Sequence, residues 1–101
     1  MYMYFKEMVT KKQLQGVGKV LSDAIAPMKA RYRALFTLKD IGGAEAVAIM
    51  ASNFSDQSVL LKHEIAYCLG QMQDEGALQI LRDIVRDERR DIIVRHEAGW
   101  C

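Results

Sequence analysis

The residues of this 101-residue chain that could best bind a metal ion are its two histidines, His63 and His96, each followed directly by a glutamate. Imidazole and carboxylate ligands together favour iron or manganese over metals that prefer sulfur. Neighbouring residues on an α-helix point about 100° apart, so a histidine and the glutamate after it diverge. We therefore expect His63 and His96 to share one ion while Glu64 and Glu97 reach toward a second.

These four side chains supply only half of the ligands of a dinuclear site, so the remaining ligands must come from elsewhere. Two other metal motifs fit less well. Neither His-Glu pair has the second histidine of a zinc-protease helix, and neither has the Glu-to-His spacing of three that ferritin-like iron proteins use. A single pair could be a packed histidine beside an ordinary surface charge, but two pairs in register favour the metal site.

An internal repeat positions the two pairs. The segment 32–38 aligns with 63–69, and a further copy begins at His96, so the offsets are 31 and then 33 residues. This period is typical of two-helix repeats, in which equivalent positions line up along one surface. Packed helices lie about 8 to 10 Å apart, which is close enough for long side chains on neighbouring helices to converge.

The apolar residues recur with helical spacing, which predicts an all-α fold, an α-solenoid of about three helical hairpins. We expect helices at 10–22, 28–41, 44–53, 58–72, 75–86 and from 91 onward. Leu61, Ile65 and Leu69 should share one buried face, as should Ala77 and Leu81. Helix ends are marked by Thr10 with Gln13, by Asp56 or Ser58, by Asp74, by Pro27, and by Gly42 with Gly43.

The whole chain, 1–101, is predicted to form a single domain. Its first seven residues, 1–7, read as a leader, and the repeat segments are 8–43, 44–74 and 75–101. The third repeat lacks a partner helix, so we expect a truncated protein. Because Trp100 would then be exposed, self-association through the last helix is also predicted.

The composition argues against several functions. A formal net charge of +1 gives no field to attract nucleic acid. The N-terminus is apolar for too few residues to be a signal peptide or a membrane span. Cys68 and Cys101, the two cysteines, are read as buried thiols of a cytoplasmic protein. The charged run 86–91 is predicted to be a solvated connection.

Three segments, 31–38, 60–74 and 94–99, resemble the deoxyhypusine hydroxylase family, and the likeness runs from about Met8 to Gly99. The resemblance implies HEAT-like repeats and a non-haem di-iron centre held by four His-Glu motifs, of which this chain carries two. It makes His63 and His96 iron ligands and Glu64 a bridge toward the second iron. Glu97 becomes a ligand or an acidic neighbour that orients the amine substrate during catalysis.

The function implied by this resemblance is that of a monooxygenase. Two Fe(II) ions per complete site would use dioxygen to hydroxylate the deoxyhypusine side chain of a translation factor precursor, giving hypusine. The present chain would carry half of that site. The alternative is a non-catalytic HEAT-repeat module that binds other proteins, and such a module would tolerate His63→Ala and His96→Ala.

Overall fold

The computed structural model describes residues 10–87, 90 and 92–99, and it contains helices without any strand in these residues. The helices are α1 (Lys11–Ser22), α2 (Met28–Ile41), α3 (Gly43–Ser52), α4 (Val59–Met72), α5 (Glu75–Arg86) and α6 (Ile92–Gly99), and the short 3-10 turn η2 (Asn53–Ser55) follows α3. The all-α prediction is confirmed, and each predicted helix end that falls on described residues lies within one residue of the observed end.

The predicted helix N-termini are confirmed by their hydrogen bonds. Thr10 and Gln13 form a capping box, in which the Thr10 hydroxyl accepts from the Gln13 N–H at 3.1 Å and the Gln13 amide oxygen accepts from the Thr10 N–H at 2.9 Å. Ser58 and Asp74 each accept a hydrogen bond from the N–H three residues further on. These side chains satisfy backbone donors that have no partner within the helix.

The turns after α2 and α4 reverse the chain by different means. Gly42 and Gly43 have φ values of 71° and 88°, a backbone region that glycine enters without steric cost. After α4 the left-handed residue is Gln73, with φ of 53°, which the sequence did not indicate. Its side-chain amide donates to the Gly70 carbonyl at 2.9 Å, and this bond satisfies a carbonyl at the helix end.

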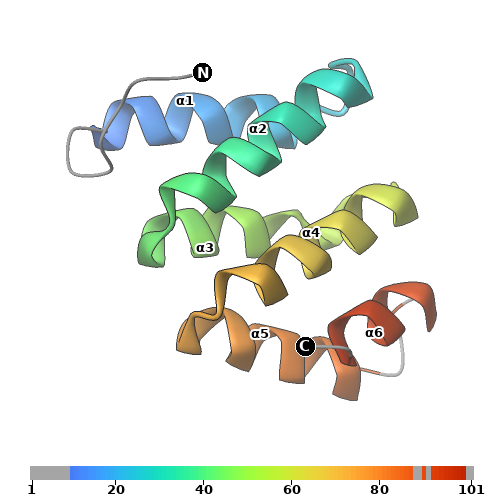
Figure 1. Cartoon of the computed structure of the whole chain (residues 1–101). Helices are drawn as coiled ribbons and strands as arrows, with labels where there is room; N and C mark the ends of the chain where they lie inside the picture. The colour runs from blue at the N-terminus through green and yellow to red at the C-terminus, as the bar shows by residue number, and fades with distance from the viewer. Residues whose placement is uncertain (1–9, 88–89, 91, 100–101) are drawn as a thin grey trace.

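The helices form two layers (Figure 1). One layer contains α1, α3 and α5, and the other contains α2, α4 and α6, with successive helices of a layer packed side by side. The core lies between the layers. Leu61, Ile65 and Leu69 of α4 are fully buried there, as are Ala77 and Leu81 of α5, so the predicted apolar faces are confirmed.

Two arginines, one buried and one half-buried, join the layers, a role that no sequence pattern indicated. Arg31 of α2 donates from Nε to the carbonyl oxygen of Leu21, at the end of α1, at 2.9 Å. Arg95 of α6 makes the equivalent bond to Val85 of α5 at 3.0 Å. In both cases the guanidinium satisfies a carbonyl in the last turn of the preceding helix.

The prediction that residues 86–91 form a solvated connection is wrong for Arg90, because its side chain is only 28% exposed. Its guanidinium lies 5.7 Å from the centre of the Phe54 ring and donates to the Phe54 carbonyl oxygen. A planar guanidinium stacks well on an aromatic face, so this arginine closes the loop onto η2. Residues 88, 89 and 91 of the run lie outside the described part of the chain.

Candidate metal centre

The candidate centre is formed by one side chain from α4 and one from α6. His63 Nε2 lies 2.7 Å from Glu97 Oε1, and the two side chains are 32% and 17% exposed. This is a hydrogen-bond distance, at which an imidazole N–H donates to the carboxylate. The contact joins the histidine of one motif to the glutamate of the next.

The packing of α4 against α6 explains this contact. A histidine and the glutamate after it differ by about 100° around the helix, so the histidine is directed toward the next helix and the glutamate toward the preceding one. His63 therefore meets Glu97 between the two packed helices. The sharing of one ion by His63 and His96 stays a prediction, because the contact that the structure shows joins His63 to Glu97.

The equivalent position between α2 and α4 holds a tyrosine in the place of the histidine. Tyr32 stands 31 residues before His63, at the equivalent repeat position. Burial raises the pKa of the Tyr32 phenol, and the negative charge of Glu64 raises it further. Glu64 is therefore near enough for its charge to act on the Tyr32 phenol. Tyr32 was not among the predicted site residues, although it aligns with His63 in the repeat.

The His63–Glu97 pair fits a metal ion of the borderline class in its donor atoms and its spacing. Two ligands bound at about 2.1 Å and at right angles hold their donor atoms roughly 3 Å apart. The observed separation of 2.7 Å is near that value. In the part of the chain that the structure describes, no three His, Cys, Asp or Glu side chains lie together as a metal site requires. The residues present therefore fit a pair of ligands.

The thiol of Cys68 is not positioned for this chemistry. The side chain is fully buried in α4, as predicted, and burial raises the pKa of its thiol to about 12, while Lys39 lowers the pKa slightly and Glu64 and Asp40 raise it slightly. A metal ligand or nucleophile must be a thiolate, so Cys68 is a packing residue. Cys101 lies outside the described residues.

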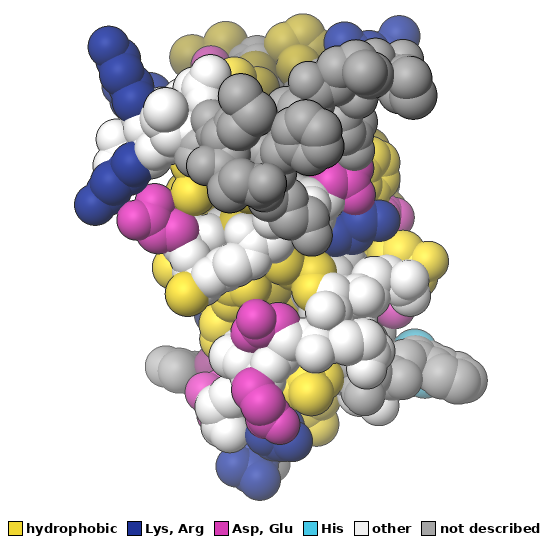
Figure 2. All heavy atoms as spheres, turned by 60° about the vertical axis from the view of Figure 1, so that its left-hand side comes forward, with side chains coloured by type: hydrophobic (Ala, Val, Ile, Leu, Met, Phe, Trp, Pro, Cys, Tyr) yellow, Lys and Arg dark blue, Asp and Glu magenta, His cyan; other side chains and the backbone are white. Residues whose placement is uncertain are grey.

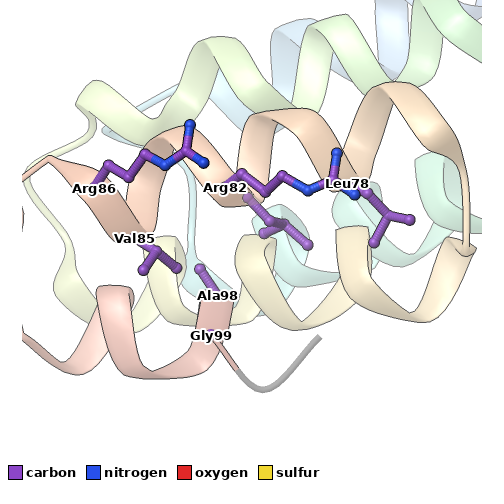
Figure 3. A pocket seen from close by; sticks show the side chains of 7 residues that line it. Leu78, Arg82, Val85, Arg86, Ala98 and Gly99 are labelled. Atoms are coloured by element: carbon purple, nitrogen blue, oxygen red, sulfur yellow. The ribbon is translucent and has the colours of Figure 1, made fainter.

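A separate apolar pocket of about 370 Å³ lies between α5 and α6 (Figure 3). Val85 and Ala98 face each other across it, and Arg82 and Arg86 stand on its rim. The lining contains no histidine or carboxylate, so it offers a metal no ligand. The predicted self-association through the last helix remains a prediction, since Trp100 is not among the described residues.

Two further properties concern the surface. Basic and acidic side chains are interspersed on the face shown in Figure 2, and neither sign forms a continuous patch there. Within the described ranges, no helix is both long and apolar enough to cross a membrane.

Comparison with known proteins relates this geometry to a family. A sequence profile described as HEAT repeats matches residues 18–101. The chain is 52% identical over 92 residues to the deoxyhypusine hydroxylase of Bos taurus and 51% identical to that of Homo sapiens, and each alignment covers 91% of this chain and 30% of the relative. The chain therefore spans less than a third of the length of these curated relatives.

A solved structure agrees with these alignments. The human deoxyhypusine hydroxylase in complex with glycerol superposes with a TM-score of 0.86 at 50% identity, covering 92% of this chain and 32% of that one. Both the fold and the sequence are therefore shared over nearly all of the present chain. From the repeat profile and from these matches, we conclude that the chain belongs to the HEAT-repeat family and is related within it to the deoxyhypusine hydroxylases.

Proposed function

We propose that this chain supplies half of a dinuclear iron site in a deoxyhypusine hydroxylase, which hydroxylates the deoxyhypusine side chain of a translation factor precursor. The observation that carries the proposal is the contact of 2.7 Å between His63 and Glu97. These residues come from the two successive His-Glu motifs. Relatives named deoxyhypusine hydroxylase, about half identical over 91% of the chain, support the same reaction.

In this proposal His63 would hold an iron through Nε2 and Glu97 would hold it through Oε1. His96 and Glu64 remain the predicted further donors. A bound iron supplies the one-electron activation of dioxygen, which organic side chains cannot provide. A neutral histidine nitrogen is the form that binds a metal, so the imidazole would coordinate through Nε2 with its proton on Nδ1.

Before iron binds, Glu97 keeps His63 ready for its role. The contact between them holds the imidazole ring in one orientation, with Nε2 directed at the carboxylate. Such preorganisation reduces the entropy that the ligands lose on binding an ion.

We assign the positively charged amine of the substrate to Glu64. For Glu97 the resemblance implied either a ligand or an acidic neighbour of the amine, and its contact with His63 supports the first of these two roles. Glu64 is half-buried on α4, and its negative charge acts on the Tyr32 phenol. A half-buried carboxylate attracts an amine by its charge.

Metal content tests this proposal directly. The 101-residue protein would be reconstituted with ferrous iron without oxygen, desalted, and measured by elemental analysis. We expect up to about one iron per chain, at least tenfold less in His63→Ala and in Glu97→Gln. Gln71→Ala is the matched control, because Gln71 is an exposed residue two turns after His63 on the same helix. It should retain the iron of the parent chain.

Two results would contradict the proposal. The first is equal iron in His63→Ala and the parent chain, which would show that bound iron lies elsewhere. The second is no retained iron in the parent chain, with circular dichroism showing that it is folded. That second result would favour the alternative, a HEAT-repeat module that binds other proteins without a metal.

A further inference from the structure

The apolar pocket between α5 and α6 is a surface separate from the candidate metal centre, and we call it the α5–α6 groove (Figure 3). Its apolar lining comes from Leu78, Leu81 and Val85 of α5 and from Ala98 and Gly99 of α6. Among the described residues that line it, none is one of the four predicted metal ligands. Binding in this groove would therefore not depend on iron.

The shape of the α5–α6 groove suits a helix. Leu78, Leu81 and Val85 occur at positions i, i+3 and i+7, a spacing that brings side chains to one side of a helix. This stripe extends about 10 Å, or two helical turns. On the opposite wall Ala98 and Gly99 contribute little side-chain volume, which leaves room for the side chains of a partner. Apolar grooves of this kind bind amphipathic helices through side chains at the same spacing.

Two arginines give the α5–α6 groove a positive rim. Arg82 and Arg86 are exposed and stand four residues apart, about 6 Å along the axis of α5. Arg82 donates to the neutral side-chain oxygen of Gln79 at 3.3 Å. In the described ranges of the chain, neither arginine forms an ion pair. Like charges at this spacing repel each other within a helix, so a negatively charged partner would relieve the repulsion.

The charge of the rim also decides between possible occupants. If two copies of the α5–α6 groove met about a two-fold axis, arginines would approach arginines, and such like-charge contacts oppose pairing. A partner that carries carboxylates would instead neutralise the rim. A guanidinium and a carboxylate form charge-assisted hydrogen bonds, which are often bidentate.

We propose that the α5–α6 groove binds an amphipathic α-helix of another protein, in which two acidic residues four positions apart border the apolar stripe. The apolar stripe of the partner would pack on the stripe from Leu78 to Val85, and its two carboxylates would pair with Arg82 and Arg86. The spacing of four is then the same on both helices, so the partner helix runs alongside α5. The arginines select an acidic helix over other amphipathic helices.

Fluorescence anisotropy with two labelled synthetic peptides tests the proposal on the iron-free chain. Both peptides are helical and carry leucines at i, i+3 and i+7. The acidic peptide has two glutamates four positions apart beside the leucines, and the basic peptide has lysines in their place. Because the groove spans only two turns, we expect a Kd of about 10 to 100 µM for the acidic peptide. The basic peptide should bind about tenfold more weakly or worse.

Charge reversal at the rim should reverse this preference. In Arg82→Glu with Arg86→Glu, the acidic peptide should bind about tenfold more weakly than to the parent chain, and the basic peptide should bind more tightly. Lys12→Glu with Lys19→Glu is the matched control, because it changes the net charge equally at two exposed positions of α1. It should change either Kd by less than about threefold. Circular dichroism checks that each variant is folded.

A third variant tests the apolar stripe. Leu78→Ser removes a half-buried leucine from the groove and should weaken the binding of the acidic peptide by about tenfold. The inference is overturned if neither peptide binds the parent chain at about 200 µM, or if both bind equally. It is also overturned if sedimentation equilibrium shows a dimer that Leu78→Ser dissociates, because a second copy would then occupy the groove. These measurements use no iron, so their failure leaves the proposed metal site untouched.

Discussion

Arg31, near the start of α2, forms a buried ion pair with Asp56, which lies in the loop before α4. The side chains are 3% and 12% exposed. Arg31 also donates to the Leu21 carbonyl, and Asp56 also accepts from the Ser58 N–H at 2.8 Å. This pair therefore connects the end of α1, the start of α2 and the loop that leads into α4, the helix that carries His63.

Asp56→Ala should lower the free energy of unfolding by about 3 kcal/mol, because it leaves the guanidinium of Arg31 buried without its counter-ion. Asp23→Ala is the matched control. Asp23 accepts a hydrogen bond from the N–H of Ile25, two residues on, as Asp56 does from Ser58, but it is exposed. Loss of this exposed hydrogen bond should lower the free energy of unfolding by only about 1 kcal/mol. Urea unfolding followed by circular dichroism measures both, and equal losses would contradict the assigned role of the ion pair.

The same carboxylate should make stability depend on acid pH. Burial by itself would raise the pKa of Asp56, but hydrogen bonds from Arg31 and Ser58 and the charges of Arg31 and Lys62 hold it below the usual 3.8. The unfolded chain then binds the proton more readily than the folded chain does, so acid favours unfolding. The stabilisation is present above about pH 4 and is lost as the pH falls through the lower pKa of the folded state.

Urea unfolding of the parent chain and Asp56→Asn between about pH 7 and pH 3 checks this dependence. The difference in stability between the two proteins should be constant near neutral pH and should shrink below about pH 4. A difference that does not change with pH would show that Asp56 titrates normally in the folded protein.

Two glycines of α1 should respond in opposite ways to the same substitution. A Cβ atom on Gly18 would lie 2.9 Å from Cγ2 of Ile49 in α3, whereas one on Gly16 would meet nothing within 4 Å. Gly16→Ala should raise the free energy of unfolding by about 0.5 to 1 kcal/mol, since alanine loses less backbone entropy in a helix. Gly18→Ala should lower it by about 1 to 3 kcal/mol through overpacking. Thermal and urea unfolding measure the stability of both variants. A higher stability than the parent chain in both variants would refute the close approach of α1 and α3.

Cys68 should be unreactive in the folded protein. With the pKa of its thiol raised to about 12, only about one thiol in 10⁴ is ionised at pH 8, and the side chain has no exposed surface. In a Cys101→Ser background, labelling by a thiol reagent should be slow and should accelerate by orders of magnitude in urea. Rapid labelling without urea would show that α4 opens locally.

The sequence alone was sufficient for the helices and their N-terminal caps, because these features depend on residues a few positions apart. The N-terminal caps act within one helical turn, and they are Thr10 with Gln13, Ser58 and Asp74. The turn after α2 depends only on the backbone freedom of Gly42 and Gly43. The apolar spacing identified the buried faces for the same reason. The repeat of 31 to 33 residues then indicated that both His-Glu motifs lie on one row of a stack.

Only the tertiary structure decided which side chains of that row meet. The direction of a side chain between two packed helices depends on their rotation and spacing, which no local pattern specifies. His63 therefore contacts Glu97, the charge of Glu64 acts on Tyr32, and Arg31 reaches Asp56 across 25 residues. The exposure of Leu60 and Tyr67 on α4 was also hidden in the sequence, because both resemble core residues until the packing shows that they face outward.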